Sequence, residues 1–300
     1  LYRRQLSAWL SDRHDHGAPP ELASVDLAAI EAYLTRLAES RWRGRQRAPA
    51  TLASVYRCLR TFWHWCARQD YLSPEQTPIF QRIDAPRVPR KPRDSADEAL
   101  VRDLLSVAGD PGAGGRDGEE AARMRAIILL LSESGARIAE IASLTDGQVD
   151  LGRRRARIVG KGEKYRTIFW GPRTAAALAQ YQLVRRGARG GDLPLFRGTS
   201  IRNNGGALST DSIRAMLKRL AAAHGIPLPP GAPLHSFRHG FARRALRDGA
   251  DISDVSQLLG HTSIQTTMIY LEGDEEHLAQ IYERVFGSGA SATTRRCKAD

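Results

Sequence analysis

Four short motifs in the 300-residue sequence carry side chains that could hold a phosphate group or move a proton. They are Arg137 with Glu140, Lys161 inside a Gly-Lys-Gly turn, His235 with Arg238, and His261 followed nine residues later by Tyr270. An arginine fork can bind two phosphate oxygens at once, and histidine exchanges a proton near neutral pH. These residue types indicate phosphate chemistry, provided that the fold brings the four motifs together.

Each motif on its own also has a plain structural explanation. Arg137 and Glu140 lie three residues apart, so they could form an ion pair on the surface of a helix. Gly-Lys-Gly turns are common at hairpin tips, and a histidine such as His235 is most often a buried structural residue. The Leu-Gly-His turn at residues 258–261, with Tyr270 after it, is the most distinctive of the four.

The charge of the chain indicates a polyanionic partner. Lys and Arg number 45 against 33 acidic residues, which gives a net charge of +12 and a pI near 10.2. This balance favours nucleic acid and disfavours small acidic substrates. Most of the basic residues are Arg, a bias that a GC-rich genome also produces. Each Lys is therefore informative, because Lys can release a proton that Arg retains.

Cysteine usage and hydropathy argue against several other classes of protein. The three cysteines are too few for a disulfide framework and lack the spacing of a zinc site, so we expect Cys58 and Cys66 to be core thiols. No apolar run approaches the roughly 18 residues of a membrane span, and no secretory signal is recognisable. These features predict a cytoplasmic protein without membrane association.

The first 83 residues have the pattern of a basic helical domain. Apolar spacing predicts helices at residues 1–10, 27–39 and 51–69, and Asp26 is the expected cap of the second. Between the last two helices, four arginines surround a tryptophan: Arg41, Arg43, Arg45 and Arg47. A solvated charged loop would have the same composition, but the basic excess of this domain favours contact with a DNA backbone.

Residues 84–94 are rich in proline and in basic side chains, among them Arg90, Lys91 and Arg93. Proline removes helical hydrogen-bond donors and stiffens an extended chain. We expect a linker here that can lie along a phosphate backbone, and a glycine-rich surface loop at residues 109–118 of the following domain.

The second domain, residues 95–286, is predicted to be mainly helical with a small β-sheet. Helices are expected at 121–134, 137–144, 172–186, 209–224, 234–248, 251–259, 264–271 and 275–285, and strands at 155–159 and 165–170. Lys161 then lies at the tip of a hairpin, and His235 and Arg238 lie one helical turn apart. We expect residues 287–300, which are small and polar, to be a disordered tail.

The four motifs, in this order and at these separations, resemble those of the tyrosine recombinase (phage integrase) family, of the Xer-like or mobile-element integrase type. The resemblance covers most of the chain. It implies a helical core-binding, SAM-like domain at residues 1–83 and an α+β catalytic domain at residues 95–286. It also implies site-specific cleavage and rejoining of DNA through a 3′-phosphotyrosyl intermediate, without a cofactor or metal.

The resemblance also assigns a role to each motif residue. Tyr270 matches the nucleophile, with Tyr282 as the alternative, and Arg137 and Arg238 match the two arginines that hold the phosphate. Lys161 matches the general acid, with Lys164 as the alternative and otherwise a contact to the DNA backbone. The remaining matches are His235 for proton transfer with the tyrosine, His261 for a hydrogen bond to the phosphate, and Glu140 for support of the first arginine.

Three residues depart from the family pattern, and each departure concerns packing. They are Ala136, Phe237 and Trp170. No functional group is lost, so we expect an intact active site. The family further implies double-stranded DNA with short inverted-repeat core sites, a location at the nucleoid, and a tetramer on two DNA sites. In that tetramer the helix at residues 275–286 would dock on a neighbouring protomer.

Two other functions remain open on the sequence. A relative that has lost its chemistry would bind DNA without cutting it, although the complete set of motif residues argues against such loss. A type IB topoisomerase shares the chemistry, although the helical N-terminal segment is of the recombinase type. Relaxation of plasmids that lack a specific site would favour the topoisomerase.

Overall fold

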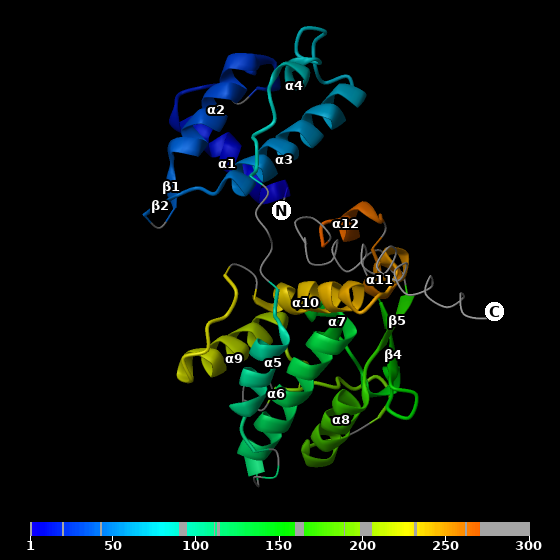
Figure 1. The fold of residues 1–300 in the computed structure, drawn as a ribbon. Helices are drawn as coiled ribbons and strands as arrows, with labels where there is room; N and C mark the ends of the chain where they lie inside the picture. The colour runs from blue at the N-terminus through cyan, green and yellow to red at the C-terminus, as the bar shows by residue number, and fades with distance from the viewer. Residues whose placement is uncertain are drawn as a thin grey trace, which may run out of the picture. The chain divides into compact units, whose positions relative to one another are not determined.

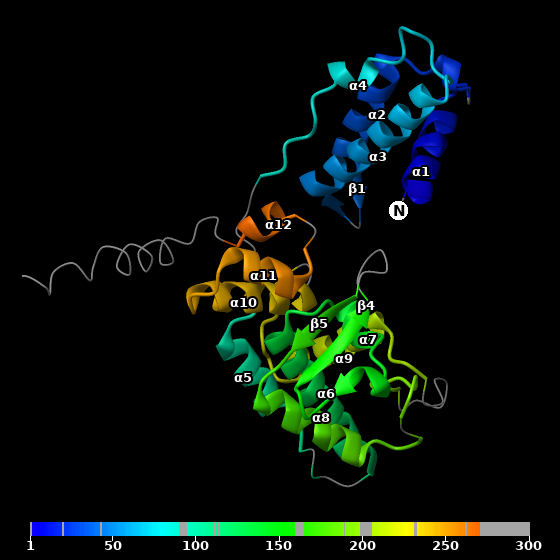
Figure 2. The same ribbon diagram turned by 90° about the vertical axis from the view of Figure 1, so that its right-hand side faces the viewer.

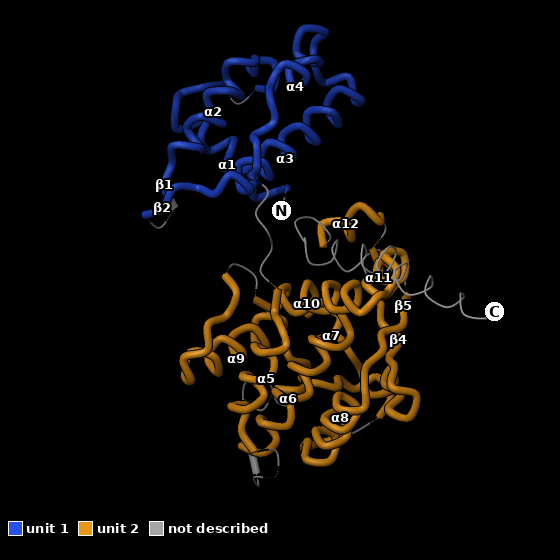
Figure 3. Tube along the Cα trace, in the orientation of Figure 1, with its two compact units in different colours: residues 1–91 blue, residues 92–300 orange. Residues whose placement is uncertain are grey.

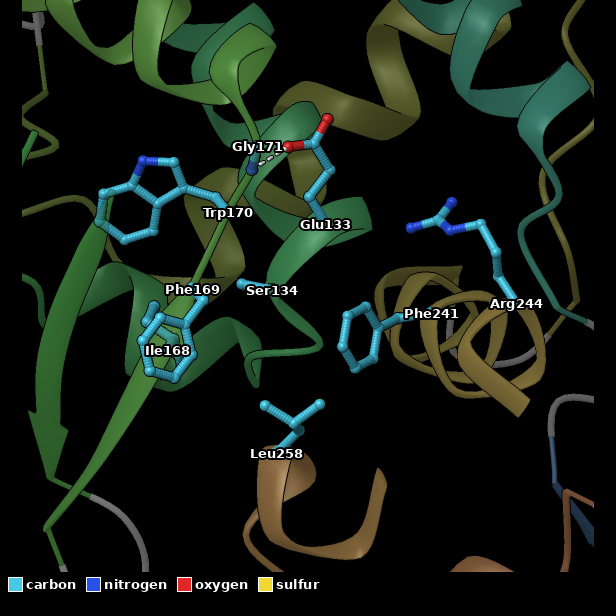
Figure 4. Close-up of a pocket in the computed structure, with 9 residues that line it drawn as sticks. All are labelled: Glu133, Ser134, Ile168, Phe169, Trp170, Gly171, Phe241, Arg244 and Leu258. Carbon is cyan, nitrogen blue, oxygen red and sulfur yellow. Dashed lines mark hydrogen bonds between the residues drawn. The ribbon is translucent and has the colours of Figure 1, made fainter. Parts of the chain in front are cut away.

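The computed structural model describes residues 2–19, 21–42, 44–89, 95–110, 112, 115–159, 165–188, 190–198, 206–230, 233–261 and 263–270. The chain divides into two compact units, residues 1–91 and 92–300, which Figure 3 distinguishes by colour. This division lies inside the stretch 84–94 that the sequence predicts as a linker. Among the helices that the structure describes, none is long and apolar enough to cross a membrane.

Three helices pack against one another in the first unit (Figure 1). They are α1 (Tyr2–Asp15), α2 (Leu27–Glu39) and α3 (Pro49–Arg68). The short helix η1 (Leu22–Ser24) lies between the first two, and α4 (Ile79–Arg82) follows the third. Trp9, Ile30 and Trp63 meet in the core between them. Asp26 caps α2 as predicted, because its side chain accepts a hydrogen bond from the N–H of Ala29.

The two cysteines of α3 are buried free thiols, as the sequence predicts. Cys58 and Cys66 lie eight residues apart, and both side chains are less than 5% exposed. Burial raises the pKa of both thiols, because a thiolate loses its hydration inside the unit. Their role is therefore in packing.

The arginine-rich segment between α2 and α3, which the sequence predicts only as a charged loop, forms a small β-hairpin. Strands β1 (Arg41–Trp42) and β2 (Arg45–Gln46) pair antiparallel, with Trp42 opposite Arg45. Gly44 between them has a positive φ of 77°. The side chains of Arg41 and Arg45 are exposed, and Arg47 donates a hydrogen bond from Nε to Ser40 Oγ at 2.8 Å.

The second unit is built around one buried helix, α6 (Gly115–Ser134). Its apolar run at residues 126–131 is almost completely enclosed. The helix packs against α5 (Glu98–Ser106), α7 (Ile138–Ala142), α8 (Pro172–Val184) and α10 (Pro233–Arg247), as Figure 1 shows. A helix surrounded on all sides needs apolar residues at every turn, which explains why the run is continuous.

A three-stranded antiparallel sheet lies beside these helices (Figure 2). Its strands are β3 (Val149–Asp150), β4 (Arg155–Val159) and β5 (Tyr165–Phe169), and the 3-10 helix η2 (Asp146–Gln148) leads into the first. Ala156 and Ile158 face inward from β4, and Arg166 and Ile168 are their partners in β5. The hairpin tip, residues 160–164, lies outside the described residues.

Three more helices complete the part of the second unit that the structure describes. They are α9 (Thr210–Ala223), α11 (Ile252–Leu259) and α12 (Gln265–Met268). Ser209 caps α9 through its side chain, which accepts from the N–H of Ser212, and α11 ends at Gly260 in the left-handed conformation. Helices α10, α11 and α12 follow one another and enclose a second small core around Ala242, Leu246 and Tyr270.

The fold class agrees with the expectation, but several element bounds differ from the prediction. Helix α1 extends to Asp15 where the prediction ends at residue 10, and α12 spans only Gln265–Met268 of the predicted 264–271. The predicted loop at 109–118 is shorter, because α6 already begins at Gly115. The predicted helix at 137–144 spans only Ile138–Ala142, since Arg137 is its cap. Strand β3 was not predicted, because its two residues are too few to show the alternation of apolar and polar side chains that marks a strand. The predicted helix at 275–286 and the tail at 287–300 lie outside the described residues.

Candidate active site

Arg238 is the centre of a cluster of charged side chains in the second unit. It lies on the inner side of α10 with 5% of its surface exposed. Its Nη1 donates to the carbonyl of Gly135 and its Nη2 to the carbonyl of Leu259, each at 2.7 Å. These carbonyls precede α7 and end α11, so one guanidinium fixes the ends of two helices close together.

Arg137 and Glu140 form a local unit at the start of α7. Glu140 Oε2 accepts a hydrogen bond from the N–H of Arg137 at 2.6 Å, and Arg137 Nη1 donates to Glu140 Oε1 at 3.0 Å. The first contact resembles a capping box, in which an acid three residues into a helix satisfies the N–H of the cap. The carboxylate is buried, so a surface ion pair is the wrong interpretation.

The pKa of Glu140 reflects this setting. Burial by itself would raise the pKa, but hydrogen bonds from the Arg137 N–H and from Arg166, with the charges of both arginines, outweigh burial. The net effect holds the pKa below its ordinary value, so Glu140 is a carboxylate at neutral pH. A fixed negative charge at this position keeps the Arg137 side chain in place.

The cluster carries more positive charge than Glu140 neutralises. Burial, and then the like charge of Arg137, lowers the pKa of Arg238 to about 10. Arg238 is still charged at neutral pH, but its positive charge is costly to hold there without an anion nearby. Such a site favours an incoming anion, because the anion relieves repulsion among the arginines.

His261 follows the turn at Gly260 and keeps a neutral imidazole. Its Nδ1 lies 2.7 Å from the hydroxyl of Thr267, a buried residue of α12. Burial, followed by the charges of Arg238, Arg137 and Arg166, lowers the pKa of His261 to about 4. At neutral pH the ring therefore has one donor nitrogen and one acceptor nitrogen.

Tyr270 lies beside two histidine rings. Its ring is stacked with that of His261 at a centroid distance of 6.4 Å, and the ring of His239 lies 5.2 Å away. Only 4% of Tyr270 is exposed. The ring of His239 is in turn 6.3 Å from that of His235, which is exposed on α10. The ring of His239 thus lies between those of His235 and Tyr270.

The structure brings most of the predicted catalytic residues together. Arg137, Glu140, Arg238, His261 and Tyr270 converge from α7, α10 and the turn after α11. Lys161 and Lys164 belong to the hairpin tip and lie outside the described residues. So do Arg43, Arg90, Lys91 and Arg93 among the predicted DNA contacts. Within the part of the chain that the structure describes, no group of three or more His, Cys, Asp or Glu side chains could hold a metal ion.

The family model described as the phage integrase family matches residues 101–277. The match spans more than half of the chain and includes the whole cluster. The chain belongs to the phage integrase family. As a member, it is a tyrosine-type site-specific DNA recombinase.

Curated relatives agree with this assignment along almost the whole chain. Tyrosine recombinase XerC of Rhodospirillum centenum is 33% identical over 290 residues, which are 94% of this chain and 79% of that protein. Tyrosine recombinase XerD of Xanthomonas axonopodis pv. citri is 32% identical and covers 94% of this chain and 88% of its own length.

Solved structures show the same fold at lower identity. The Tn1549 transposon integrase in complex with a circular intermediate DNA has a TM-score of 0.70 and 20% identity, over 94% of this chain and 92% of that chain. The XerH recombinase bound to a palindromic difH substrate has a TM-score of 0.69 and 19% identity, over 94% of this chain and 77% of that chain. The recombinase therefore has the two-domain architecture that the sequence predicts.

Two members of the recombinase cluster were not predicted. Arg166 of β5 bonds Glu140 with a distance of 2.7 Å from Nη2 to Oε2, and Thr267 holds His261. The sequence contained a signal for Arg166, because it is two residues from Ile168 and so lies on the same, inward side of the strand. Thr267 had none, since its partner depends on the path of the chain after α11.

A basic groove on the first unit was also missed. It has a volume of about 550 Å³ and lies along α3, next to the start of α1. Arg57, Arg60 and His64 line it at spacings of three and four residues, together with Ser54 and Thr61. The three basic side chains are exposed, opposite the apolar stripe of α3. Plotting α3 as a helical wheel would have revealed this face.

Proposed function

We propose that this recombinase cleaves and rejoins DNA through a 3′-phosphotyrosyl intermediate, with Tyr270 as the nucleophile. The observation that carries the proposal is the gathering of Arg137, Arg238 and His261 around Tyr270. A tyrosine beside two arginines and a neutral histidine is suited to attack on a phosphodiester, because the arginines attract the anion. The family relationship supports the same assignment.

The reaction exchanges one phosphorus–oxygen bond for another. The Tyr270 hydroxyl loses its proton and attacks phosphorus, and the bond from phosphorus to the 5′-oxygen breaks. The 5′-oxygen takes up a proton and leaves as a hydroxyl. The phosphotyrosyl bond preserves the energy needed for rejoining, when a 5′-hydroxyl attacks it in the reverse sense. Because Tyr270 is 4% exposed, we expect DNA binding to expose its hydroxyl before attack.

Charge stabilisation is the main contribution of the two phosphate arginines. Negative charge grows on the non-bridging oxygens in the transition state, and fixed guanidinium groups neutralise it without reorganising. Arg238 is held by two carbonyls and Arg137 by Glu140, so both start in place. These guanidinium groups supply the positive charge, so we expect the reaction to proceed in the presence of a chelator.

Proton transfer falls to the remaining motif residues. We assign Lys161 as the general acid for the 5′-oxygen, because a lysine can release a proton that arginine retains. His235, next to His239 on α10, would receive the Tyr270 proton. His261, neutral at working pH, would donate one hydrogen bond to the phosphate while Thr267 holds its other nitrogen.

Contacts to the DNA backbone are proposed on the first unit and on the linker at residues 84–94. Arg41 and Arg45 are exposed on the β1–β2 hairpin, and Arg57 and Arg60 line the groove on α3. Arginine at these positions suits phosphate oxygens, which give no sequence information by themselves. We propose that Arg43, Arg47 and the linker residues Arg90, Lys91 and Arg93 contact the DNA backbone as well.

Strand exchange needs more than one protomer, because each one cuts a single strand. We propose a tetramer on two short inverted-repeat sites, in which residues 275–286 of each protomer dock on the next. Cyclic docking of one segment closes a ring of identical interfaces. A protein that acts on chromosomal or element DNA would work at the nucleoid.

Covalent trapping tests the reaction class. The wild-type protein is incubated with chelator and a duplex from its genomic neighbourhood that carries a nick beside the suspected cleavage point. The adduct is then resolved under denaturing conditions. Tyr270→Phe should abolish the adduct, and Tyr282→Phe, the matched control, should leave it unchanged.

Two outcomes would contradict the proposal. An adduct that survives in Tyr270→Phe but is lost in Tyr282→Phe would assign the nucleophile to the other tyrosine. Tight, salt-sensitive binding by the wild type, without an adduct on any nicked duplex, would identify a DNA-binding protein without this chemistry.

A further inference from the structure

The side chain of Arg166 connects three parts of the second unit that are far apart in sequence. It extends inward from β5, and 11% of the side chain is exposed. Its Nη2 donates to Glu140 Oε2 at 2.7 Å, and its Nη1 donates to the carbonyl of Leu258 at the end of α11. One fork thus bridges a strand, the start of α7 and the turn that precedes His261.

The chain at Gly260 fits closely over Arg166. Gly260 has a φ of 66°, and a Cβ added there would lie 2.6 Å from Arg166 Cδ and 3.0 Å from Nε. A side chain at residue 260 would therefore be strained and would also collide with the arginine stem. The position of Arg166 and the path of the turn toward His261 depend on each other.

Arg166 and Arg238 hold neighbouring carbonyls of this turn. Arg166 bonds the carbonyl of Leu258, and Arg238 bonds that of Leu259. Glu140 is shared in the same way: Oε2 receives Arg166, while Oε1 receives Arg137. Arg166 therefore contacts the partner of each phosphate arginine: Glu140, which holds Arg137, and the end of α11, which holds Arg238.

We propose that Arg166 is a positioning residue for the recombinase reaction, which aligns Arg137 and the turn carrying His261 with the strand that follows Lys161. The inference rests on the proposed function for the roles of those residues. We assign Arg166 no contact with the phosphate or the nucleophile; its two Nη atoms bond Glu140 and the carbonyl of Leu258. Its contribution comes through Glu140 and through the turn at residues 258–261.

Two features of the fork set it apart from a simple charge. The two Nη atoms reach acceptors on different elements at once, and a lysine has a single nitrogen for the same task. The charge also acts on His261, whose pKa is lowered by burial first, then by Arg238, Arg137 and Arg166. Among the described residues, the Thr267 hydroxyl and the Tyr270 ring also face His261.

Removing each feature separately distinguishes positioning from general support of the fold. Arg166→Gln removes both the charge and the fork, so the pKa of His261 should rise toward its ordinary value. Arg166→Lys keeps the charge and loses the fork, so the pKa of His261 should stay low while alignment is lost. Arg155→Gln is the matched control, because Arg155 is exposed on the neighbouring strand β4.

The experiment measures two quantities on the full-length proteins. The pKa of His261 is followed by NMR titration of histidine-labelled free protein, with the resonance assigned from His261→Gln. The rate of adduct formation is followed on the nicked duplex at saturating DNA. Thermal melting and DNA affinity are recorded for every variant.

We expect Arg166→Gln to slow adduct formation at least about tenfold and to raise the His261 pKa, with DNA affinity unchanged within about twofold. Arg166→Lys should be slow as well, with a wild-type His261 pKa. Arg155→Gln should match the wild type in both. A higher His261 pKa would also move the acid limb of the pH–rate profile of Arg166→Gln to higher pH.

Several results would overturn the inference. One is a wild-type rate of adduct formation in Arg166→Lys, and another is an unchanged His261 pKa in folded Arg166→Gln. A third is a rate of adduct formation in Arg166→Gln that falls only in proportion to its loss of DNA affinity. If Arg166→Gln does not fold, the rate and His261 pKa of Arg166→Lys decide. If the wild type forms no adduct, the proposed function fails, while the His261 titrations still test whether Arg166 controls that ring.

Discussion

A single buried hydroxyl fixes the ring of His261. Thr267 is fully buried in α12, and its Oγ1 lies 2.7 Å from His261 Nδ1. A partner on Nδ1 determines which way the ring faces and which nitrogen remains available to a phosphate. His261 has a pKa of about 4, so this tautomer, and not a positive charge, is what the site offers at neutral pH.

Replacing this hydroxyl should impair chemistry more than stability. Thr267→Val keeps the shape and removes the hydrogen bond, so we expect about a tenfold slower adduct formation and a loss of about 1 kcal/mol in the free energy of unfolding. Single-turnover trapping and thermal melting measure the two effects. Thr266→Val, at an exposed neighbouring position, is the control. Equal rates in both variants would show that Thr267 does not set the ring.

Helix α10 carries His235, Arg238 and His239, and a close approach determines where it lies. The N–H of Ala96, just before α5, donates to the carbonyl of Ser236 at 3.0 Å. A Cβ added at Gly240 would lie 2.0 Å from the carbonyl oxygen of Ala96. The backbone before α5 therefore passes directly over Gly240 of α10. A larger residue at position 240 would push α10 and this backbone apart.

Gly240→Ala should accordingly displace α10. Overpacking against a backbone atom cannot be relieved by a side-chain rotation, so we expect a loss of about 2–3 kcal/mol in the free energy of unfolding. Denaturant unfolding measures it. Gly152→Ala is the control, since the nearest atom to its added Cβ is at 3.6 Å. A neutral Gly240→Ala would mean that the segment around Ala96 yields easily.

Each of the two units has its own apolar core, and we propose that each contributes separately to binding DNA. The first unit has a core around Trp63 and presents the basic groove along α3, whereas the second carries the arginine cluster. With a net charge of +12, the whole chain should bind DNA with a steep dependence on salt. Affinity and chemistry can therefore be altered independently.

Whether the groove on α3 contacts the DNA backbone can be tested by its contribution to the salt dependence of DNA affinity. Replacing Arg57 and Arg60 together with Gln should flatten the slope of log Kd against log salt by about 2, since each phosphate contact releases about one counterion. Fluorescence anisotropy at several salt concentrations measures the slope. Arg173→Gln, exposed on α8, is the control. An unchanged slope in the double variant would place the groove away from the backbone.

Helix and strand positions were largely available from the sequence, because their signals are local. Asp26 and Ser209 cap the helices that follow them, and Gly260 ends α11, each through contacts within a few residues. The motif residues could also be identified from the sequence, because their order and spacing along the chain carry the family resemblance. The sequence alone thus determined the fold class and the residues to consider for chemistry.

The arrangement of the site was decided by tertiary structure, because its contacts join residues far apart in the chain. Arg238 meets Gly135 across 103 residues, and Arg166 meets the carbonyl of Leu258 across 92. Local patterns cannot distinguish a surface ion pair at Glu140 from a buried one, nor show that Tyr270 is enclosed beside His239. Burial and long-range hydrogen bonds exist only once the helices have packed, and they determine which charged side chains gather near Tyr270.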